Sequence, residues 1–561
     1  MIDYKQHIAN LIKDSFPQIG DFSVVNPPKE EMGDFSVGTF TLNIDGLKNP
    51  VEKAIFMKNV IEDKSDKYIS KVAVAGPYLN FYINRALMAE SVIKDIMYEK
   101  DKFGSMKQGN GESLLIEHTS INPNASPHIG RARNSIIGNF LTRLFRFVGY
   151  DVETHYFIND IGKQISMLVV GIEHGGDINN ISFSETLALY VKINEESKTN
   201  VEIEKEVFKY LNDLENGNEQ TRDKFKKITD ICVKGQQEIF AKMGIGFDVF
   251  THESDFVFGD TTKQILESLR NKGKLCEDDN GRLYVDLSGY DIPTKSPVLV
   301  LTREDKTSLY PLRDIAYTIY KMKLNPKNNY IVLGEDQKVY MQQISAVLNI
   351  LGYGAPELIS YSFVLLNGDK MATRQGKVVL LEDFLEEAKK KLRTGFVERG
   401  SEINEDVISS MASSCVKYNM LNVHRHLNVN FNLEEATNFQ GDSAVYLLYN
   451  YARINNILAK TGAPDNSMPI EFVNSIEYSL ISDLYSFPEI IQNVLSAKES
   501  VILIKYLHAL AQKFAKYYNE VHINNEQDSV LKNSRVLLIM CIKTVLENGM
   551  NVLGITPIEK L

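Results

Sequence analysis

Residues 114–152 read LLIEHTSINPNASPHIGRARNSIIGNFLTRLFRFVGYDV, which combines a short apolar strand, a loop, a helix and the start of a second strand. The first strand covers 114–116, and the loop after it contains two prolines. Apolar residues recur at helical spacing from 134 to 148, Gly149 ends that helix, and Val152 begins another extended segment. This order is typical of the opening of a doubly wound parallel sheet, so we expect a multidomain α/β protein with a Rossmann-like core.

The rest of the chain is organised around this unit. Residues 1 to about 90 alternate helical and extended signals, which predicts a small α+β domain, and the polar stretch 101–113 is typical of a linker. Residues 171–235 are charge-rich with helical periodicity and predict an insertion. Further strands are expected at 283–285, 298–301, 330–333 and 361–366. The expected domains are 1–100, 111–385 with the insertion near 171–235, and an all-α domain at 386–561.

Composition limits the class of protein without identifying a partner. The chain has 561 residues, 43% hydrophobic and 24% charged, which is ordinary for a globular protein of several domains. No apolar run reaches the roughly eighteen residues of a membrane helix, and the N-terminus lacks the features of a signal peptide. The four cysteines are widely scattered, so we expect reduced thiols, no metal site and a cytoplasmic protein. The net charge of −11 still allows a local basic face for RNA.

The loop at 118–131 is the first candidate site, because doubly wound sheets bind ligands between a strand and the following helix. The helix N-terminus supplies free N–H groups and a positive dipole for phosphate. Gly130 would allow a nucleotide to approach the backbone closely, and His128 could donate to a phosphate oxygen. The alternative is an ordinary turn and helix start, since a three-residue motif is often matched by chance.

This loop resembles the His-x-Gly-His signature of class I aminoacyl-tRNA synthetases, with Arg131 in place of the second histidine. The flanking residues narrow the resemblance to the arginyl-tRNA synthetases. Glu117, Asn122 and the stretch RNSIIG at 133–138 match that family's pattern around the signature. The resemblance implies that Glu117 and Asn122 hold the α-amino and carboxylate side of arginine, and that Asn124, His128 and Gly130 contact ATP.

Two further segments are similar to arginine-binding motifs of the same family. The segment YPLRDIAY at 310–317 places Tyr310 and Asp314 four residues apart, on one face of a helix. A guanidinium is recognised by a planar carboxylate and an aromatic face, although alone the pair could be a solvent-facing feature. The segment GEDQKVYMQQ at 334–343 resembles the family's Gly-x-Glu-Gln-Asp-x-His-x-x-Gln, which makes Gln337 a substrate-binding candidate. Lys338 and Tyr340 depart from its acid and histidine.

The segment KMATRQGKVV at 370–379 resembles the class I Lys-Met-Ser-Lys-Ser loop in its arginyl variant. The family's second lysine is replaced by Thr373, and the lysine that some relatives place before the first signature is absent, since Ala125 stands there. Lys370, Arg374 or Lys377 would then supply the charge near the β- and γ-phosphates, and Met371 would contact ATP. Without the resemblance, this segment would be interpreted as a solvated basic turn.

Both ends of the chain extend the resemblance. The stretch FQGDSAVYLLYNYARI at 439–454 looks like the start of the family's helical anticodon-binding domain, and NGMNVLGI at 548–555 looks like its last helix. The stretch PPKEEMGDF at 27–35 is similar to the extra N-terminal domain of these enzymes. Helix packing is the preferred explanation for most of the tyrosine cluster Tyr446, Tyr449 and Tyr451.

The resemblance implies an ATP-dependent arginine–tRNA ligase. Arginine would attack the α-phosphate of ATP, and a ribose hydroxyl of the tRNA would then attack the arginyl-adenylate. His128, Gly130, Arg131, Lys370, Arg374 and Lys377 would assist by positioning and by stabilising charge, with Mg²⁺ on the phosphates. The partners would be tRNA, L-arginine and ATP, with no membrane, and the protein would be a monomer.

Three alternatives remain open at this stage. A synthetase for another amino acid would not need Glu117, Tyr310 and Asp314 together. A noncatalytic RNA-binding relative would be compatible with the altered residues Arg131, Ala125 and Thr373. A nucleotidyltransferase that uses no tRNA would leave the helical C-terminal third without a purpose.

Overall fold

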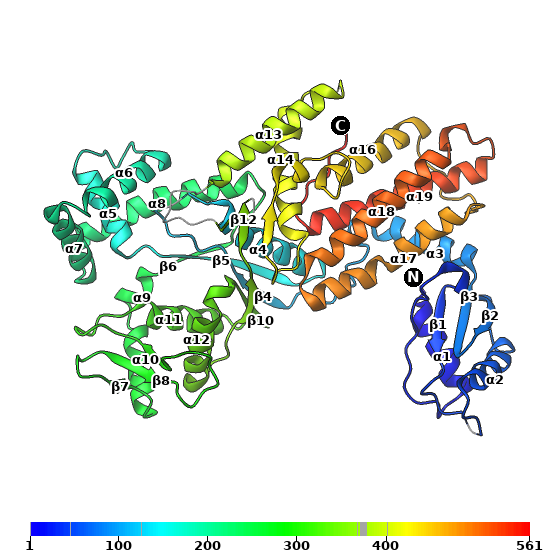
Figure 1. The fold of residues 1–561 in the computed structure, drawn as a ribbon, viewed down its shortest axis with the longest axis horizontal. Coiled ribbons are helices and arrows are strands. Elements are labelled where there is room, and N and C mark those ends of the chain that lie inside the picture. Colours follow the sequence, from blue (N-terminus) through cyan, green and yellow to red (C-terminus); the bar gives the residue numbers. More distant parts are fainter. Residues whose placement is uncertain (1, 45, 125, 367–368, 371–378, 401) are drawn as a thin grey trace.

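The computed structural model describes the whole chain except residues 1, 45, 125, 367–368, 371–378 and 401 (Figure 1). Its central sheet has five strands in the order β11-β10-β4-β5-β6, and every neighbouring pair is parallel. The strands are β4 (Ser113–Glu117), β5 (Asp151–Ile158), β6 (Val249–His252), β10 (Asn328–Gly334) and β11 (Glu357–Tyr361). The strand order reverses between β4 and β10, as in a doubly wound sheet, so the predicted fold class is confirmed.

Helices and a second sheet surround this core. α4 (Ile129–Phe147) begins five residues before the helix expected at 134, because His128 caps it by accepting a hydrogen bond from the N–H of Arg131. One hydrophobic cluster joins the sheet to α9 (Ser254–Phe258), α10 (Thr261–Asn271), α11 (Tyr310–Lys323) and α12 (Lys338–Leu351). The strands expected at 283–285 and 298–301 lie in a separate antiparallel sheet of β7 (Cys276–Glu277), β8 (Leu283–Asp286) and β9 (Val298–Val300).

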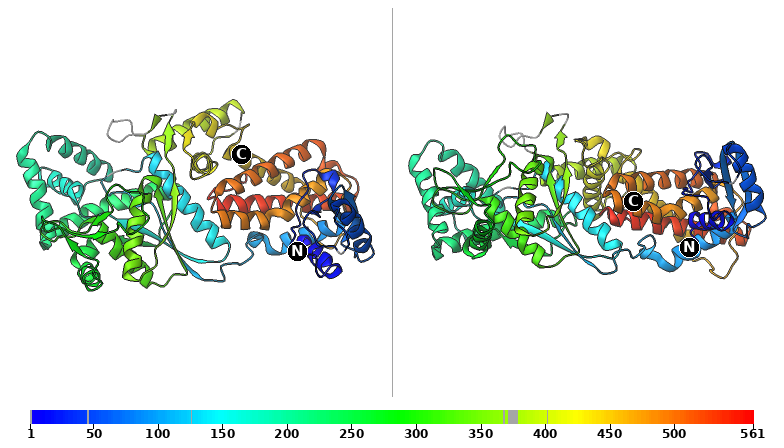
Figure 2. Two further views of the ribbon diagram at one scale, coloured as in Figure 1. Left: turned by 60° about the horizontal axis from the view of Figure 1, so that its bottom comes forward. Right: turned by 90° about the horizontal axis from the view of Figure 1, so that it is seen from below.

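The polar stretch 171–235 lies within a group of helices between β5 and β6. They are α5 (Lys163–Glu173), α6 (Phe183–Glu196), α7 (Val201–Glu215) and α8 (Glu219–Ala241). The apolar faces of α5, α7 and α8 form small hydrophobic clusters, which allows this group to protrude from the sheet. In both views of Figure 2 these helices and the N-terminal domain lie at opposite ends of an elongated molecule.

The expectation of one strand at 361–366 is wrong, because the chain leaves the central sheet after Tyr361. The N–H of Ser362 donates to the carbonyl of Arg425 rather than to a neighbouring strand of the sheet. β12 (Val364–Leu366) then pairs with β13 (Asp369–Lys370) and with β14 (Val429–Phe431). β14 lies within the region expected to be all helical, so that region supplies one strand to the catalytic side.

The remaining C-terminal elements are helices. They are α13 (Leu381–Glu398), α14 (Glu405–Leu421), α15 (Leu433–Ala436), α16 (Ala444–Thr461), α17 (Ser475–Ala497), α18 (Ser500–Glu520) and α19 (Ser529–Val552). One hydrophobic cluster joins these helices to α4 and to the N-terminal domain. No helix in the described part of the chain has the length and apolarity needed to cross a bilayer.

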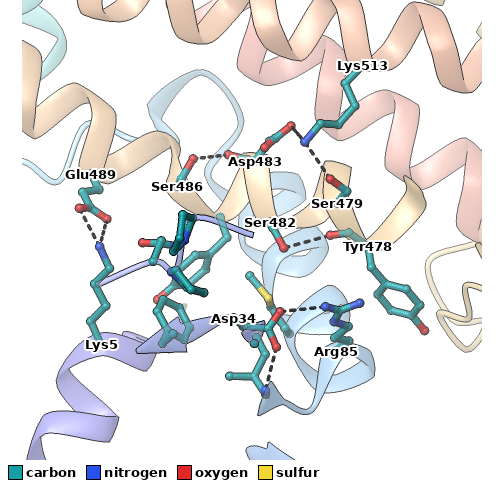
Figure 3. A pocket seen from close by; sticks show the side chains of 18 residues that line it. Lys5, Asp34, Arg85, Tyr478, Ser479, Ser482, Asp483, Ser486, Glu489 and Lys513 are labelled. Carbon is teal, nitrogen blue, oxygen red and sulfur yellow. Dashed lines mark hydrogen bonds and ion pairs between the residues drawn. The ribbon is translucent and has the colours of Figure 1, made fainter. Parts of the chain in front are cut away.

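The N-terminal domain is an antiparallel sheet covered by helices, as expected for an α+β unit. It contains α1 (Tyr4–Ser15), β1 (Phe35–Gly38), α2 (Pro50–Glu62), β2 (Ile69–Ala75), β3 (Tyr78–Ile83) and α3 (Arg85–Glu99). Figure 3 shows the cavity between this domain and helices α17 and α18. Its cations are paired with acids: Lys5 with Glu489, Arg85 with Asp34, and Lys513 with Asp483. These compensated charges are typical of a domain interface.

Candidate active site

The signature loop lies where the strand order reverses, between the carboxyl ends of β4 and β10. Asn134 holds the loop there, since its Oδ1 accepts from the N–H of Thr119 at 2.6 Å and its Nδ2 donates to the carbonyl of Val332 at 2.8 Å. Gly138 lets α4 cross directly over His118, because a Cβ at this glycine would lie 2.2 Å from the imidazole Cγ. The motif residues around the signature therefore have a structural explanation in the path of α4.

His128 and Gly130 lie at the N-terminus of α4, where the helix dipole is positive. Nδ1 of His128 accepts from the N–H of Arg131 at 3.2 Å. Burial, followed by the charge of Arg131, lowers the pKa of His128 to about 4, so the imidazole is neutral near pH 7. A neutral imidazole that accepts at Nδ1 carries its proton on Nε2, which makes His128 a hydrogen-bond donor.

Arg131 and Asn124 offer further polar groups beside this imidazole. Among the described residues, the partly buried guanidinium of Arg131 forms no hydrogen bond or ion pair, and burial lowers its pKa. Asn124 is buried, and its Oδ1 has no hydrogen-bond partner among the described atoms. Asn122, nearby in the loop, donates through Nδ2 to Gln164 at 3.1 Å. A cation and a helix N-terminus together suit an anionic ligand.

Three carboxylates gather beside the loop, on α11 and at the ends of β4 and β6; together with the side chains that contact them we call them the acidic pocket. Asp314 of α11 accepts a hydrogen bond from the hydroxyl of Tyr340 of α12. The rings of Tyr310 and Tyr340 are 5.6 Å apart, and Tyr310 is exposed. One tyrosine therefore contacts the carboxylate and a second ring lies beside the first, and a guanidinium prefers a carboxylate together with an aromatic face.

Two more carboxylates lie near Asp314, and each has its own cation. Glu117 at the end of β4 forms a buried ion pair with Lys321 of α11. Glu253, directly after β6, lies 3.0 Å from Nε of Arg313 and accepts from Asn159 at 3.0 Å. Burial raises the pKa of Glu253, while Arg313 opposes that rise.

Among the described residues, Asp314 is the carboxylate of this group that forms no ion pair, although the nearby charge of Arg313 also acts to lower its pKa. Burial and the nearby charges of Glu253 and Glu117 raise its pKa to about 7, while the hydrogen bond from Tyr340 opposes the rise. The three acids and two cations leave a formal charge of −1 when Asp314 is ionised. A buried site with one uncompensated negative charge stabilises a single bound cation.

The other predicted site residues are less enclosed or lie partly outside the described residues. Gln337 is exposed and donates to Asp336 at 2.8 Å. Lys370 ends β13, whereas Met371, Arg374 and Lys377 lie outside the described residues, as do Ala125 and Thr373. The chain that follows this gap returns to the signature, since the N–H of Ile129 donates to the carbonyl of Val379 and the N–H of Leu381 donates to that of Pro127.

Sequence reasoning missed four residues of the acidic pocket. In the sequence, Tyr340 is distinguished only as a departure from the family's histidine, and Arg313 only as part of its motif. Glu253 follows a short extended segment, and an acid at the end of a strand is a signal that could have identified it. Lys321 is two helical turns beyond Asp314, and no local signal shows that it faces Glu117.

Comparisons with known proteins agree with this geometry. A family model described as "tRNA synthetases class I (R), catalytic domain" matches residues 92–433. Models described as "Arginyl tRNA synthetase N terminal domain" and "DALR anticodon binding domain" match residues 3–83 and 447–561. The doubly wound core and its signature loop are therefore those of a class I aminoacyl-tRNA synthetase.

Relatives that match over the whole chain identify the family within this class. The arginine–tRNA ligases of Methanococcus aeolicus and Methanocaldococcus jannaschii are 32% and 33% identical, over 98% and 99% of this chain and 99% of each relative. The arginyl-tRNA synthetase structure of Thermus thermophilus shares the fold, with a TM-score of 0.78 at 22% identity over 99% of this chain and 100% of that one. The chain belongs to the arginyl-tRNA synthetase family.

Proposed function

We propose that this protein joins L-arginine to its tRNA with ATP, through an arginyl-adenylate. The carboxylate of arginine attacks the α-phosphate and releases pyrophosphate. The terminal ribose hydroxyl of the tRNA then attacks the adenylate carbonyl and releases AMP. The observation that carries this proposal is the acidic pocket beside the signature loop, whose uncompensated charge of −1 matches one guanidinium.

The pocket residues divide the recognition of arginine between its two ends. Asp314 and Tyr310 bind the guanidinium, and Tyr340 holds the Asp314 carboxylate in place. Glu117 and Asn122 lie on the β4 side, where the α-amino and carboxylate groups would face the signature loop, and Gln337 closes the site from the end of β10. Lysine would leave Asp314 without a bidentate partner, which favours arginine.

ATP is expected to bind against the N-terminus of α4. His128, Gly130 and Asn124 contact the nucleotide in this proposal, together with Met371 of the second signature segment. Arg131, Lys370, Arg374 and Lys377 supply the positive charge for the leaving pyrophosphate. No group of three or more acids, histidines or cysteines suited to a metal occurs among the described residues, so Mg²⁺ would be held mainly by the phosphates of ATP.

The tRNA would lie along the helical region and the N-terminal domain. The proposed domains are 1–100, a catalytic domain at 111–385 with the insertion near 171–235, and an anticodon-binding domain at 386–561. On α16 and α18 the guanidinium of Arg453 lies over the rings of Tyr449 and Tyr518, at 4.9 and 4.8 Å from their centroids. Exposed tyrosines beside an arginine are suitable stacking partners for unpaired bases.

We also infer a cytoplasmic monomer. The four cysteines form no disulfide, which suits a reducing compartment. The residues and domains proposed for both reaction steps all belong to one chain, which suits a monomer. Gel filtration with light scattering would test the oligomeric state.

An aminoacylation assay with total tRNA, ATP–Mg²⁺ and a panel of amino acids tests the function. We expect charging with arginine and none with lysine, citrulline or glutamine. Citrulline is the sharpest competitor, because it keeps the shape of arginine and lacks the charge. Charging with citrulline at a rate similar to arginine would contradict the role of the acidic pocket.

A further inference from the structure

Arg133 is a fully buried cation that the proposed chemistry does not use. It lies one turn into α4, and its guanidinium donates to backbone carbonyls of two segments that are distant in sequence. Nη1 donates to Ser362 at 2.6 Å and to Leu427 at 2.8 Å, and Nη2 donates to His424 at 3.3 Å. Within the described residues, no carboxylate lies close enough to Arg133 for an ion pair.

The first of these segments leads to the third motif of the active site. Ser362 follows β11, where the chain leaves the central sheet. Its hydroxyl lies 2.7 Å from the Glu335 carboxylate and 2.8 Å from the carbonyl of His426. Glu335 begins the turn Glu335–Gln337 at the end of β10, which we call the Gln337 turn. The hydrogen bond from Ser362 to Glu335 therefore connects the Gln337 turn to the residues that surround Arg133.

The second segment leads to the helical region. Arg425 lies within 424–427, and its backbone N–H donates to Glu499 at 3.2 Å. Its side chain lies 3.1 Å from the Glu499 carboxylate and donates to the carbonyls of Ala497 and Lys498 at 3.0 Å each. These residues form the corner between α17 and α18, so segment 424–427 is held by Arg133 on one side and by this corner on the other.

The chemistry of arginine suits such a junction. A buried cation loses its hydration, and carbonyl dipoles replace only part of it, so an ordinary packing position would favour an apolar residue. The planar guanidinium can bond several carbonyls at once in a fixed geometry, which lysine cannot do. Burial lowers the pKa of Arg133 to about 10, and it therefore stays charged at neutral pH.

We propose that Arg133 and Arg425 are positioning residues that connect the α17–α18 corner, through segment 424–427 and Ser362, to the Glu335–Gln337 turn and the signature helix. Both arginines hold the same segment, Arg133 from the signature helix and Arg425 from the corner, so the loss of either one loosens segment 424–427 and with it Ser362. This inference rests on the proposed function, because the orientation of the Gln337 turn matters only for the aminoacylation reaction.

Two single variants and their double variant test the connection in the full-length enzyme. Arg425→Met removes the side-chain bonds to the α17–α18 corner. Arg133→Lys keeps the positive charge but loses the planar guanidinium that bonds several carbonyls at once. We expect each to lower kcat per active site by about tenfold, with the KM for arginine, ATP and tRNA within about twofold of the parent. The double variant should be within about twofold of the worse single variant, because both changes break one link.

Arg393→Met is the matched control, since Arg393 pairs with Glu405 between α13 and α14, away from the junction. It should keep the parent kcat. The folded fraction of each variant is measured by circular dichroism and thermal unfolding, so a loss of folded enzyme is not mistaken for a lower kcat. If Arg133→Lys fails to fold, Arg425→Met decides the question.

Three results would overturn the inference: a parent-like kcat for Arg425→Met, an increase in the KM for tRNA as its main effect, or multiplicative losses in the double variant. Failure of the parent enzyme to charge tRNA with arginine would instead contradict the proposed function.

Discussion

The hydroxyl of Tyr340 donates a hydrogen bond to the carboxylate of Asp314, which joins helix α12 to helix α11 inside the acidic pocket. This bond holds the carboxylate that forms no ion pair within the described part of the chain. It also counteracts part of the pKa rise that burial imposes on Asp314. The pair therefore sets both the position and the ionisation of the group that we assign to the guanidinium.

Replacement of Asp314 by asparagine removes the charge and keeps the shape. We expect Asp314→Asn to raise the KM for arginine by about a hundredfold, because a largely desolvated ion pair loses a few kcal/mol. The KM for ATP should change by less than about twofold. Steady-state aminoacylation with each substrate varied in turn measures both, and equal small changes would remove Asp314 from the arginine site.

Removal of the hydroxyl alone isolates the contribution of Tyr340. Tyr340→Phe should raise the KM for arginine by about tenfold or more, since a hydrogen bond to a charged group contributes about 1.5–3 kcal/mol. Tyr320→Phe is the control, because Tyr320 is on the same helix as Asp314 but is exposed. If both variants behave alike, the hydroxyl of Tyr340 has no special role.

The raised pKa of Asp314 predicts that arginine binding depends on pH. The ordinary value is 3.8 and the folded value is about 7, so in the free enzyme the carboxyl becomes protonated as the pH falls through 7. Since only the carboxylate pairs with a guanidinium, the Kd for arginine should be about tenfold weaker at pH 6 than at pH 8. Isothermal titration calorimetry measures this difference, and Asp314→Asn should abolish it.

The same shift affects stability in the opposite direction. The folded state binds the proton of Asp314 more tightly than the unfolded state does, so its contribution to stability is present at low pH and lost as the pH rises through about 7. Bound arginine compensates for that loss. The increase in Tm caused by arginine should therefore be larger at pH 8 than at pH 6. A larger increase at pH 6 would contradict the assignment.

The second signature segment lacks its usual second lysine, and Arg374 is the neighbouring cation that is always charged. We expect Arg374→Ala to lower kcat by about a hundredfold, or about 2.7 kcal/mol, because an interaction made only in the transition state affects kcat. The KM for ATP should hardly change, and Lys377→Ala should have a smaller effect. A kcat within about twofold of the parent would contradict this role of Arg374 and make Arg131 the next candidate for the cation that stabilises the pyrophosphate.

Local patterns predicted much of the fold. The apolar spacing from 114 to 152 was sufficient for the strand, loop, helix and strand, because hydrophobic periodicity is a property of neighbouring residues. The start of α4 was placed too late, since the residues before Asn134 lack that periodicity and the helix begins instead at a side-chain cap. The break at Ser362 was missed because its partner, Arg425, is distant in sequence.

The sequence by itself determined the chemical types at the site: His128 and Gly130 at a helix start, and Asp314 and Tyr310 on one helical face. These placements follow from short-range geometry. Only the tertiary structure decided which charges cancel. Lys321 is 204 residues from Glu117, and Arg313 is paired with Glu253 from another strand end. Electrostatic interactions depend on distance in space and on burial, so the lack of an ion pair at Asp314 among the described residues becomes visible only when the chain is folded.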